Sequence, residues 1–233
     1  MSVAIEGKPI GRRVVLGMLG LGSVGVLVGG RLQDAIASVF ANDPTGITSL
    51  LPTGGRFRIY SVVGYLPSRK TAEYQLEISG LVDTPVTLSY ADLVALPPTR
   101  MTKDFQCVTG WRVQDVKWVG VRLSDLLDAA GVQDEAKAIT FHSFDGSYSE
   151  SLTLDQARRP DVIVAYSMEG KAIPARHGGP VRLYVAPMYG YKSIKWLDKI
   201  EVVNAVQPGY WEVRGYDVDA WIGRSNGRDD QPV

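Results

Sequence analysis

From Arg56 onward, short apolar segments alternate with turn residues, and this spacing constrains the fold more than any other feature of the sequence. Residues 73–79 alternate polar and apolar side chains, as a half-buried strand does. Further strands are expected at 138–144, 162–166, 181–185 and 196–203. The 25 glycines and 13 prolines supply the turns that many short strands need. The pattern therefore predicts a β-rich domain and not a helical bundle.

Two short helices are expected between the strands. Ser89 is placed to cap a helix over residues 89–95, and Ser124 to cap a second helix over residues 123–130. In the second helix, Leu126 and Leu127 face inward, and Gly131 marks the end. Because the helices are scattered among strands, the predicted class is α+β, rich in β, with a mixed or antiparallel sheet.

The first 41 residues carry a targeting pattern. Arg12 and Arg13 precede an uncharged, glycine-rich run over residues 14–30, and its length of about 17 residues is the short limit for crossing a bilayer. Paired arginines before such a run are typical of a twin-arginine export signal, and a retained membrane anchor is the alternative. We expect residues 1–41 to direct the chain across the cytoplasmic membrane, to the periplasm or cell surface, or to tether it there.

The remaining chain divides into three parts. Residues 42–55 contain proline and glycine in a polar stretch and are predicted to form a linker. Residues 56–206 contain no internal linker and are of ordinary size for one domain. Residues 207–233 are aromatic and polar, and we expect this extension to pack on the surface of the domain.

The composition and the motifs exclude several kinds of partner and of active site. The net charge is zero and the pI about 6.7, which does not favour nucleic acid as a partner. One cysteine excludes an intramolecular disulfide, and with only two histidines it also excludes a cysteine-based zinc cluster. The common hydrolase, metalloprotease and P-loop motifs are missing from the sequence. A nucleophilic pair of Cys107 with His142 or His177 stays open, because sequence does not show which side chains meet.

Two longer segments carry the functional signal. The first is DFQCVTGW at residues 104–111, followed by VKWVGV; the second is GKAIPARHGGPVR at 170–182, followed by GYKSIKWL, and they lie about 70 residues apart. Together they resemble the molybdopterin-binding domain of sulfite oxidases and of the bacterial protein-methionine-sulfoxide reductase catalytic subunit. The resemblance covers residues 56–206. It implies a sulfite-oxidase-type molybdopterin-binding fold with mixed sheets and short helices.

The resemblance also implies roles for individual residues. Cys107 would be the catalytic cysteine, the thiolate ligand of a molybdenum atom held by a pterin dithiolene, and soft thiolates suit such a metal. The other contacts to this molybdenum–molybdopterin cofactor would be Tyr60, Ser61, Ser143, His177, Arg182, Ser193, Ile194 and Lys195. Lys195 would neutralise the phosphate of the pterin, and Gly178 and Gly190 would allow close approach of the backbone. Arg112 and Arg176 are candidate contacts for an anionic substrate.

The function implied is oxygen-atom transfer on a small-molecule or protein substrate, an S-oxide or N-oxide. Electrons would be exchanged with a separate partner, such as a membrane haem protein or a cytochrome. Oxidation of sulfite is the first alternative, and a non-catalytic binding module with the same fold is the second. A cysteine hydrolase or thiol redox protein is a further rival. The sequence leaves the substrate and the direction of the reaction open.

Overall fold

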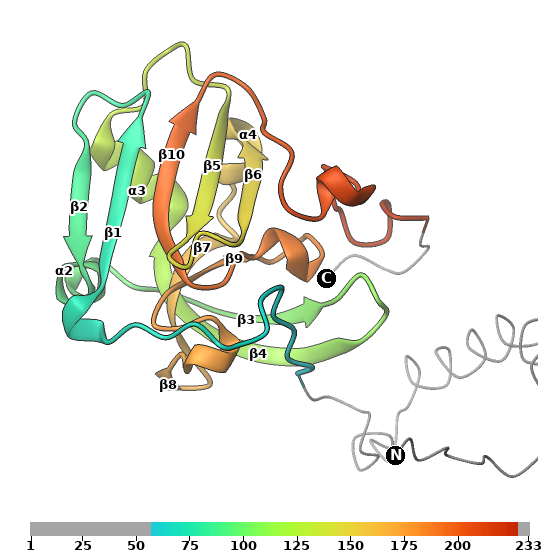
Figure 1. Ribbon diagram of the computed structural model, residues 1–233. Helices are drawn as coiled ribbons and strands as arrows, with labels where there is room; N and C mark the ends of the chain where they lie inside the picture. The colour runs from blue at the N-terminus through green and yellow to red at the C-terminus, as the bar shows by residue number, and fades with distance from the viewer. Residues whose placement is uncertain (1–56, 228–233) are drawn as a thin grey trace, which may run out of the picture. The chain divides into compact units, whose positions relative to one another are not determined.

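A computed structural model of the protein describes residues 57–227 (Figure 1). The expected export signal or anchor, the linker at 42–55 and the last six residues lie outside the described residues. The strands are β1 (Gln75–Gly80), β2 (Val86–Ser89), β3 (Thr99–Gln106), β4 (Arg112–Arg122), β5 (Ala138–Ser143), β6 (Ser149–Thr153), β7 (Val162–Met168), β8 (Lys171–Ala172), β9 (Arg182–Val185) and β10 (Leu197–Val203). The helices are α2 (Tyr90–Ala95), α3 (Leu123–Ala130) and α4 (Leu154–Ala157), with short 3₁₀ turns η2 (Thr71–Glu73), η3 (Ala175–His177), η4 (Gly190–Lys192) and η5 (Glu212–Arg214).

The strands form two sheets. The first has the order β2-β1-β10-β5-β6, in which β1 and β10 run parallel and the other neighbours antiparallel. The second has the order β3-β4-β7-β8, with β9 also paired to β7, and all its pairs are antiparallel. In Figure 1 the long β3–β4 hairpin extends away from the first sheet. The β-rich α+β class with a mixed sheet is confirmed.

The larger hydrophobic cluster joins the first sheet, α3 and the inner faces of β7 and β9. Helix α3 contributes Leu123, Leu126, Leu127 and Ala130, all buried. A smaller cluster lies along β4 and β7, where the ring of Trp118 stacks on that of Tyr184 with 4.3 Å between centroids. Because this second cluster fixes the hairpin, it sets the position of the β3–β4 loop.

The two expected helices differ in how they begin. Ser89 caps α2 as predicted, in a reciprocal capping box with Asp92. The bounds of α3 are also confirmed, but the prediction that Ser124 caps it is wrong. The N-cap is Arg122, and Ser124 lies inside the first turn, where its hydroxyl contacts Asp125 Oδ1 at 3.2 Å.

The chain after β10 returns along β6, at the edge of the first sheet, and we call residues 207–227 the C-terminal segment. The backbone N–H of Tyr210 donates to Ser149 O at 3.0 Å, and that of Gln207 donates to Ser151 Oγ at 3.3 Å. Ala220 and Ile222 further along are buried. Over residues 57–227, no helix has the length and apolar character needed to cross a membrane.

Candidate active site

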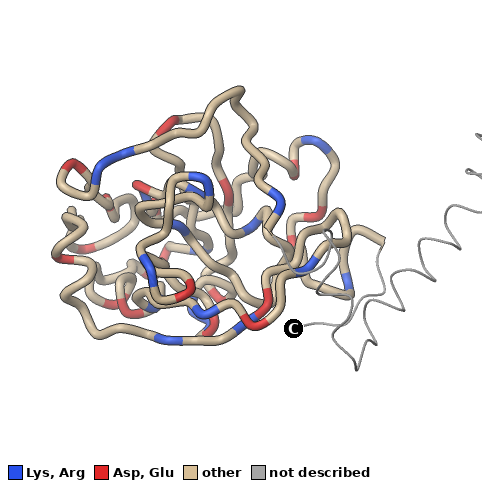
Figure 2. The backbone as a smooth tube through the Cα atoms, turned by 90° about the horizontal axis from the view of Figure 1, so that it is seen from below, with Lys and Arg blue, Asp and Glu red and all other residues tan. Residues whose placement is uncertain are grey.

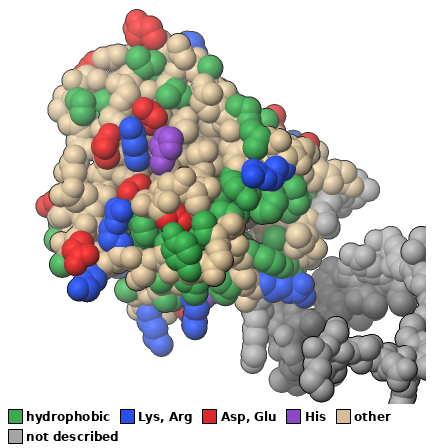
Figure 3. All heavy atoms as spheres, in the orientation of Figure 1, with side chains coloured by type: hydrophobic (Ala, Val, Ile, Leu, Met, Phe, Trp, Pro, Cys, Tyr) green, Lys and Arg blue, Asp and Glu red, His purple; other side chains and the backbone are tan. Residues whose placement is uncertain are grey.

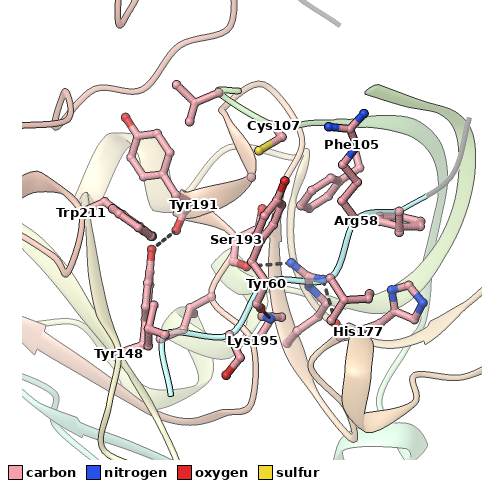
Figure 4. A pocket seen from close by; sticks show the side chains of 18 of the residues that line it. Arg58, Tyr60, Phe105, Cys107, Tyr148, His177, Tyr191, Ser193, Lys195 and Trp211 are labelled. Atoms are coloured by element: carbon pink, nitrogen blue, oxygen red, sulfur yellow. Dashed lines mark hydrogen bonds between the residues drawn. The ribbon is translucent and has the colours of Figure 1, made fainter. Parts of the chain in front are cut away.

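A cavity of about 370 Å³ lies where the β3–β4 loop, the segments on either side of β9, residues 57–62 and the C-terminal segment meet (Figure 4). Its volume is in the range of pockets that hold small molecules and cofactors. It is therefore the candidate active site.

The β3–β4 loop brings Cys107 to the cavity. Gln106 pairs with Arg112 at the end of the hairpin, so residues 107–111 form the turn. The turn is closed by two hydrogen bonds, from Cys107 N to Trp111 O and from Gly110 N to Cys107 O, each 2.9 Å long. Gly110 has φ of 100°, which favours glycine. The Thr109 hydroxyl lies 3.2 Å from Cys107 Sγ and is placed to donate a hydrogen bond to the sulfur.

Four cationic side chains line the same cavity: Arg58, Arg176, Arg182 and Lys195. Among the described residues that line it, none is Asp or Glu. Elsewhere, basic and acidic positions are interspersed along the described chain, as Figure 2 shows. The cavity therefore concentrates positive charge on a protein whose net charge is zero, and it is suited to an anionic ligand.

Arg182 is the most deeply buried of these cations, with 3% of its surface exposed. Its guanidinium group donates to the carbonyl oxygens of His177 at 2.8 Å and Ser193 at 2.7 Å. It also lies over the ring of Phe105, 5.2 Å from the centroid. Burial lowers the pKa of Arg182 to about 10, so the group stays protonated at neutral pH. Its position ties the loop before β9 to the loop after it.

Lys195 depends on a glycine for its position. Gly178 has φ of 95°, and a Cβ built there would lie 2.5 Å from Lys195 Cβ. The Lys195 ammonium donates to Tyr60 O and lies 4.3 Å from the ring centroid of Trp196. Burial, and then the positive charge of Arg182, lowers the pKa of Lys195 to about 8.

His177 is neutral at physiological pH. Burial lowers its pKa to about 4, and the charges of Arg182, Arg176 and Lys195 act in the same direction. Its ring lies edge-on to Phe57, with 4.9 Å between centroids. A neutral imidazole both donates and accepts hydrogen bonds, which suits the polar edge of a heterocycle.

Most of the residues named by the sequence motifs line this cavity. They are Tyr60, Ser61, Cys107, Arg176, His177, Arg182, Ser193, Ile194 and Lys195. The backbone holds several of them: Ser193 Oγ accepts from Val185 N at 2.9 Å, and Ile194 O accepts from Leu183 N at 2.9 Å. Two distant sequence segments thus meet at one site.

Ser143 and Arg112 lie outside the lining of the cavity. The Ser143 hydroxyl donates to Asp145 Oδ1 at 2.5 Å and closes a turn after β5. Arg112 is exposed and pairs with Asp104 across the hairpin. The structure therefore gives these two side chains local partners and does not bring them to Cys107.

His142 also lies away from the cavity, with Nε2 3.2 Å from Glu201 Oε2. Of the two histidines considered as partners of Cys107, only His177 lines the same cavity as the thiol.

Sequence reasoning missed several residues of the site. One is Arg58, on an N-terminal strip that leaves Ile59, Tyr60, Tyr65 and Leu66 exposed. On the face seen in Figure 3, hydrophobic side chains gather with basic ones among them. A further group consists of the aromatic residues of one wall: Tyr148, Tyr191, Tyr210, Trp211 and Tyr216. The only hint in the sequence was the aromatic character of the C-terminal residues. Whether their side chains face the cavity depends on contacts with residues far away in the sequence.

Comparison with known families agrees with this geometry. The model of the oxidoreductase molybdopterin binding domain matches residues 63–211, more than half of the chain. The chain belongs to this family. Its sulfite-oxidase-type fold, its molybdopterin cofactor and its oxidoreductase class, which the motifs implied, are thereby confirmed.

Several known proteins are similar in sequence to this chain. The uncharacterized oxidoreductase YuiH of Bacillus subtilis is 36% identical over 64% of this chain and 76% of its own length. The protein-methionine-sulfoxide reductase catalytic subunit MsrP of Campylobacter jejuni is 33% identical over 61% of this chain and 53% of its own. Sulfite oxidase of Arabidopsis thaliana is 30% identical over 61% of this chain and 45% of its own length. The chain thus spans about half of the length of the latter two.

Among solved structures, the sulfane dehydrogenase SoxCD of Paracoccus pantotrophus superposes with a TM-score of 0.60 and 26% identity. The match covers 65% of this chain and 43% of that one.

The residues present fit the cofactor of the family. A phosphate and an electron-rich pterin need cations, and the cavity supplies four cations with no acidic side chain among its described lining residues. A molybdenum ligand needs a thiol that reaches the cavity, and Cys107 is partly exposed there. A planar heterocycle needs apolar surfaces. Phe105 and Trp111 provide them, and their two ring planes stack with an angle of 26° between them.

Proposed function

We propose that the chain is a molybdenum–pterin oxidoreductase that carries out oxygen-atom transfer, in the direction of S-oxide or N-oxide reduction. One observation carries the proposal: the only cysteine of the sequence opens into a cavity whose charged lining residues are all basic. The names of the relatives, a sulfoxide reductase and a sulfite oxidase, support this class of chemistry.

The bound cofactor supplies the two-electron redox centre. The protein supplies position and charge: Cys107 would provide the thiolate ligand, and the Thr109 hydroxyl, 3.2 Å away, would donate a hydrogen bond to the sulfur. Arg182 and Lys195 would hold the anionic end of the cofactor, and neutral His177 would contact its polar edge. Reduction of a sulfoxide consumes two protons and two electrons per molecule and releases water. The electrons come from a separate redox protein, for which a membrane haem protein or a cytochrome is suited.

Sulfite oxidation is the second candidate, because Arg176 lies on the cavity, is exposed, and suits an oxyanion. We further propose that the chain acts outside the cytoplasmic membrane, on the strength of the paired arginines at 12 and 13 and the uncharged run that follows.

The proposed function is tested on the full chain expressed with molybdate. We expect about one molybdenum atom per chain by elemental analysis, and oxidation of reduced viologen that depends on an added sulfoxide. Sulfite with ferricyanide tests the opposite direction. Protein without molybdenum and without either activity would support the non-catalytic module. Activity of metal-free protein that iodoacetamide blocks would support the cysteine hydrolase.

Lys195 predicts how anion binding depends on pH. Its pKa of about 8 lies below the ordinary value of 10.5, so it loses its charge as the pH rises through 8. We expect the affinity of cofactor-free protein for inorganic sulfate to fall about tenfold between pH 7 and pH 9, since a charged hydrogen bond is lost. Sulfate keeps its charge over this range, so the change in affinity reports on the protein. Calorimetric titration measures the change, and Lys195→Met should bind weakly at both pH values; a variant as pH-dependent as the native chain would contradict the assignment.

A further inference from the structure

One wall of the cavity consists of aromatic rings in a closed circuit, and we call it the aromatic wall (Tyr148, Tyr191, Tyr210, Trp211 and Tyr216). Tyr148 stacks on Tyr210 with 5.4 Å between centroids, and Tyr210 meets Trp211 at 5.2 Å. Trp211 meets Tyr216 at 5.3 Å, and Tyr216 meets Tyr191 at 5.5 Å. A hydrogen bond of 2.8 Å from Tyr148 to Tyr191 O closes the circuit. All five line the cavity.

The aromatic wall lies apart from the basic residues. In Figure 4, Tyr148, Tyr191 and Trp211 lie on one side of the cavity, and Arg58, Phe105 and His177 lie on the other, with Cys107 at the edge between them. The hydroxyls of Tyr148 and Tyr191 donate to backbone carbonyls, the second to Asp217 O at 2.6 Å. Because these two phenol protons are used within the protein, Tyr148 and Tyr191 present ring surface more than hydrogen-bond donors to the cavity.

A buried charge cluster holds the aromatic wall in place. Lys192, which follows Tyr191, lies between Glu150 and Glu212, and the three side chains are at most 1% exposed. Glu212 follows Trp211 and also accepts from Gly209 N at 2.7 Å. A Cβ at Gly209 would lie 2.8 Å from Glu150 Oε1, so only glycine lets the segment approach this closely. The cluster thus joins three segments that contain or directly adjoin wall residues.

We propose that the aromatic wall is the substrate-recognition surface of the site, and that it selects organic sulfoxides with an aromatic or large apolar substituent on sulfur. This inference rests on the proposed function. Rings and sulfur-containing groups gain favourable contacts with aromatic faces, whereas a small hydrated oxyanion does not. Reduction converts R–S(=O)–R′, two protons and two electrons into R–S–R′ and water, and the electrons come from the separate redox partner. The wall contacts the substituents, and the basic side holds the cofactor.

The test compares two sulfoxides on molybdenum-loaded full chain: methyl p-tolyl sulfoxide, which has an aromatic substituent and is chiral, and dimethyl sulfoxide, which has neither feature. In the native protein we expect a kcat/KM for the aryl substrate at least about tenfold higher, through a lower KM, since one pocket contact is worth this much discrimination. We also expect one enantiomer to be consumed faster.

Trp211→Leu and Tyr216→Leu should each remove most of this preference and reduce the enantiomer selectivity, without lowering the molybdenum content. Tyr65→Leu is the matched control, because Tyr65 is 61% exposed and lies outside the cavity lining. A native protein that reduces both substrates with equal kcat/KM would overturn the inference without reference to any variant. Loaded protein that reduces neither sulfoxide would instead count against the proposed function.

Discussion

Cys107→Ala is expected to lower sulfoxide-dependent turnover by more than about 100-fold. Changes in residues around a metal ligand typically cost 10- to 100-fold in affinity or activity, and removal of the ligand itself should cost more. Among the residues lining the cavity, Cys107 carries the only thiol, so no other side chain there can replace it as a thiolate ligand. Viologen oxidation per chain, with molybdenum content measured on the same sample, gives the result.

Thr109→Val is the matched control for this experiment. It removes the hydroxyl 3.2 Å from Cys107 Sγ and keeps the shape of the side chain. We expect it to lower turnover by about tenfold, as for other residues that orient a ligand. Cys107→Ala with native turnover and native molybdenum content would exclude Cys107 as a ligand. Circular dichroism of each variant separates this outcome from a failure to fold.

The sequence predicts several central strands well, because burial gives them either a continuous apolar run, as in β7, or an alternating pattern, as in much of β10. β7 and β9 are buried along almost their whole length, and β5 and β10 lie beside each other in the first sheet. The end of helix α3 is also predictable from the local sequence, because Gly131 follows it and takes φ of 70°, a conformation that favours glycine. These elements carry their signal within a few residues, so local reasoning finds them.

The β3–β4 hairpin was not identified as strands, although it carries Cys107. Its register shifts between Lys103 and Phe105, and such a bulge breaks the alternation that marks a strand. Its stabilising contact is also distant: the Tyr184 hydroxyl donates to Asp104 O at 2.6 Å, from 80 residues away. The motif predicted that this segment binds the cofactor, but the sequence did not predict its secondary structure.

Some residues of the candidate site could likewise be predicted from the sequence, and others could not. Arg182 and Lys195 were found because they lie within sequence motifs, whereas Arg58 and Trp211 reach the cavity from the two ends of the described chain. Arg112 shows the opposite case, because it lies five residues after Cys107 and still pairs outward with Asp104. Proximity in the sequence therefore does not decide which cations face the cavity.

Lys192→Met is expected to lower the free energy of unfolding by about 3–5 kcal/mol, the usual cost of leaving a buried charge without its partner. The ammonium contacts Glu150 Oε1 at 2.7 Å and also Glu212, where both carboxylates are almost fully buried. Burial raises the pKa of Glu150; Lys192 acts in the opposite direction, and the charge of Glu212 adds to the increase. Without Lys192, the Glu150 carboxyl should bind a proton more readily in the folded chain. The deficit should therefore grow as the pH rises through about 8, where Glu150 of the native chain loses its proton and Glu150 of the variant keeps it.

Urea unfolding of each variant measures this effect, and Lys70→Met is the matched control. Lys70 and Glu73 form an exposed pair at 3.7 Å, which should contribute less than about 1 kcal/mol. If the cost arises from unpaired charge, adding Glu150→Gln and Glu212→Gln to Lys192→Met should restore much of the stability. A triple variant as unstable as the single one would point to lost packing instead. Because Glu212 adjoins Trp211, the single variant should also lose the preference for aryl sulfoxides, which links the stability of the fold to the selectivity of the cavity.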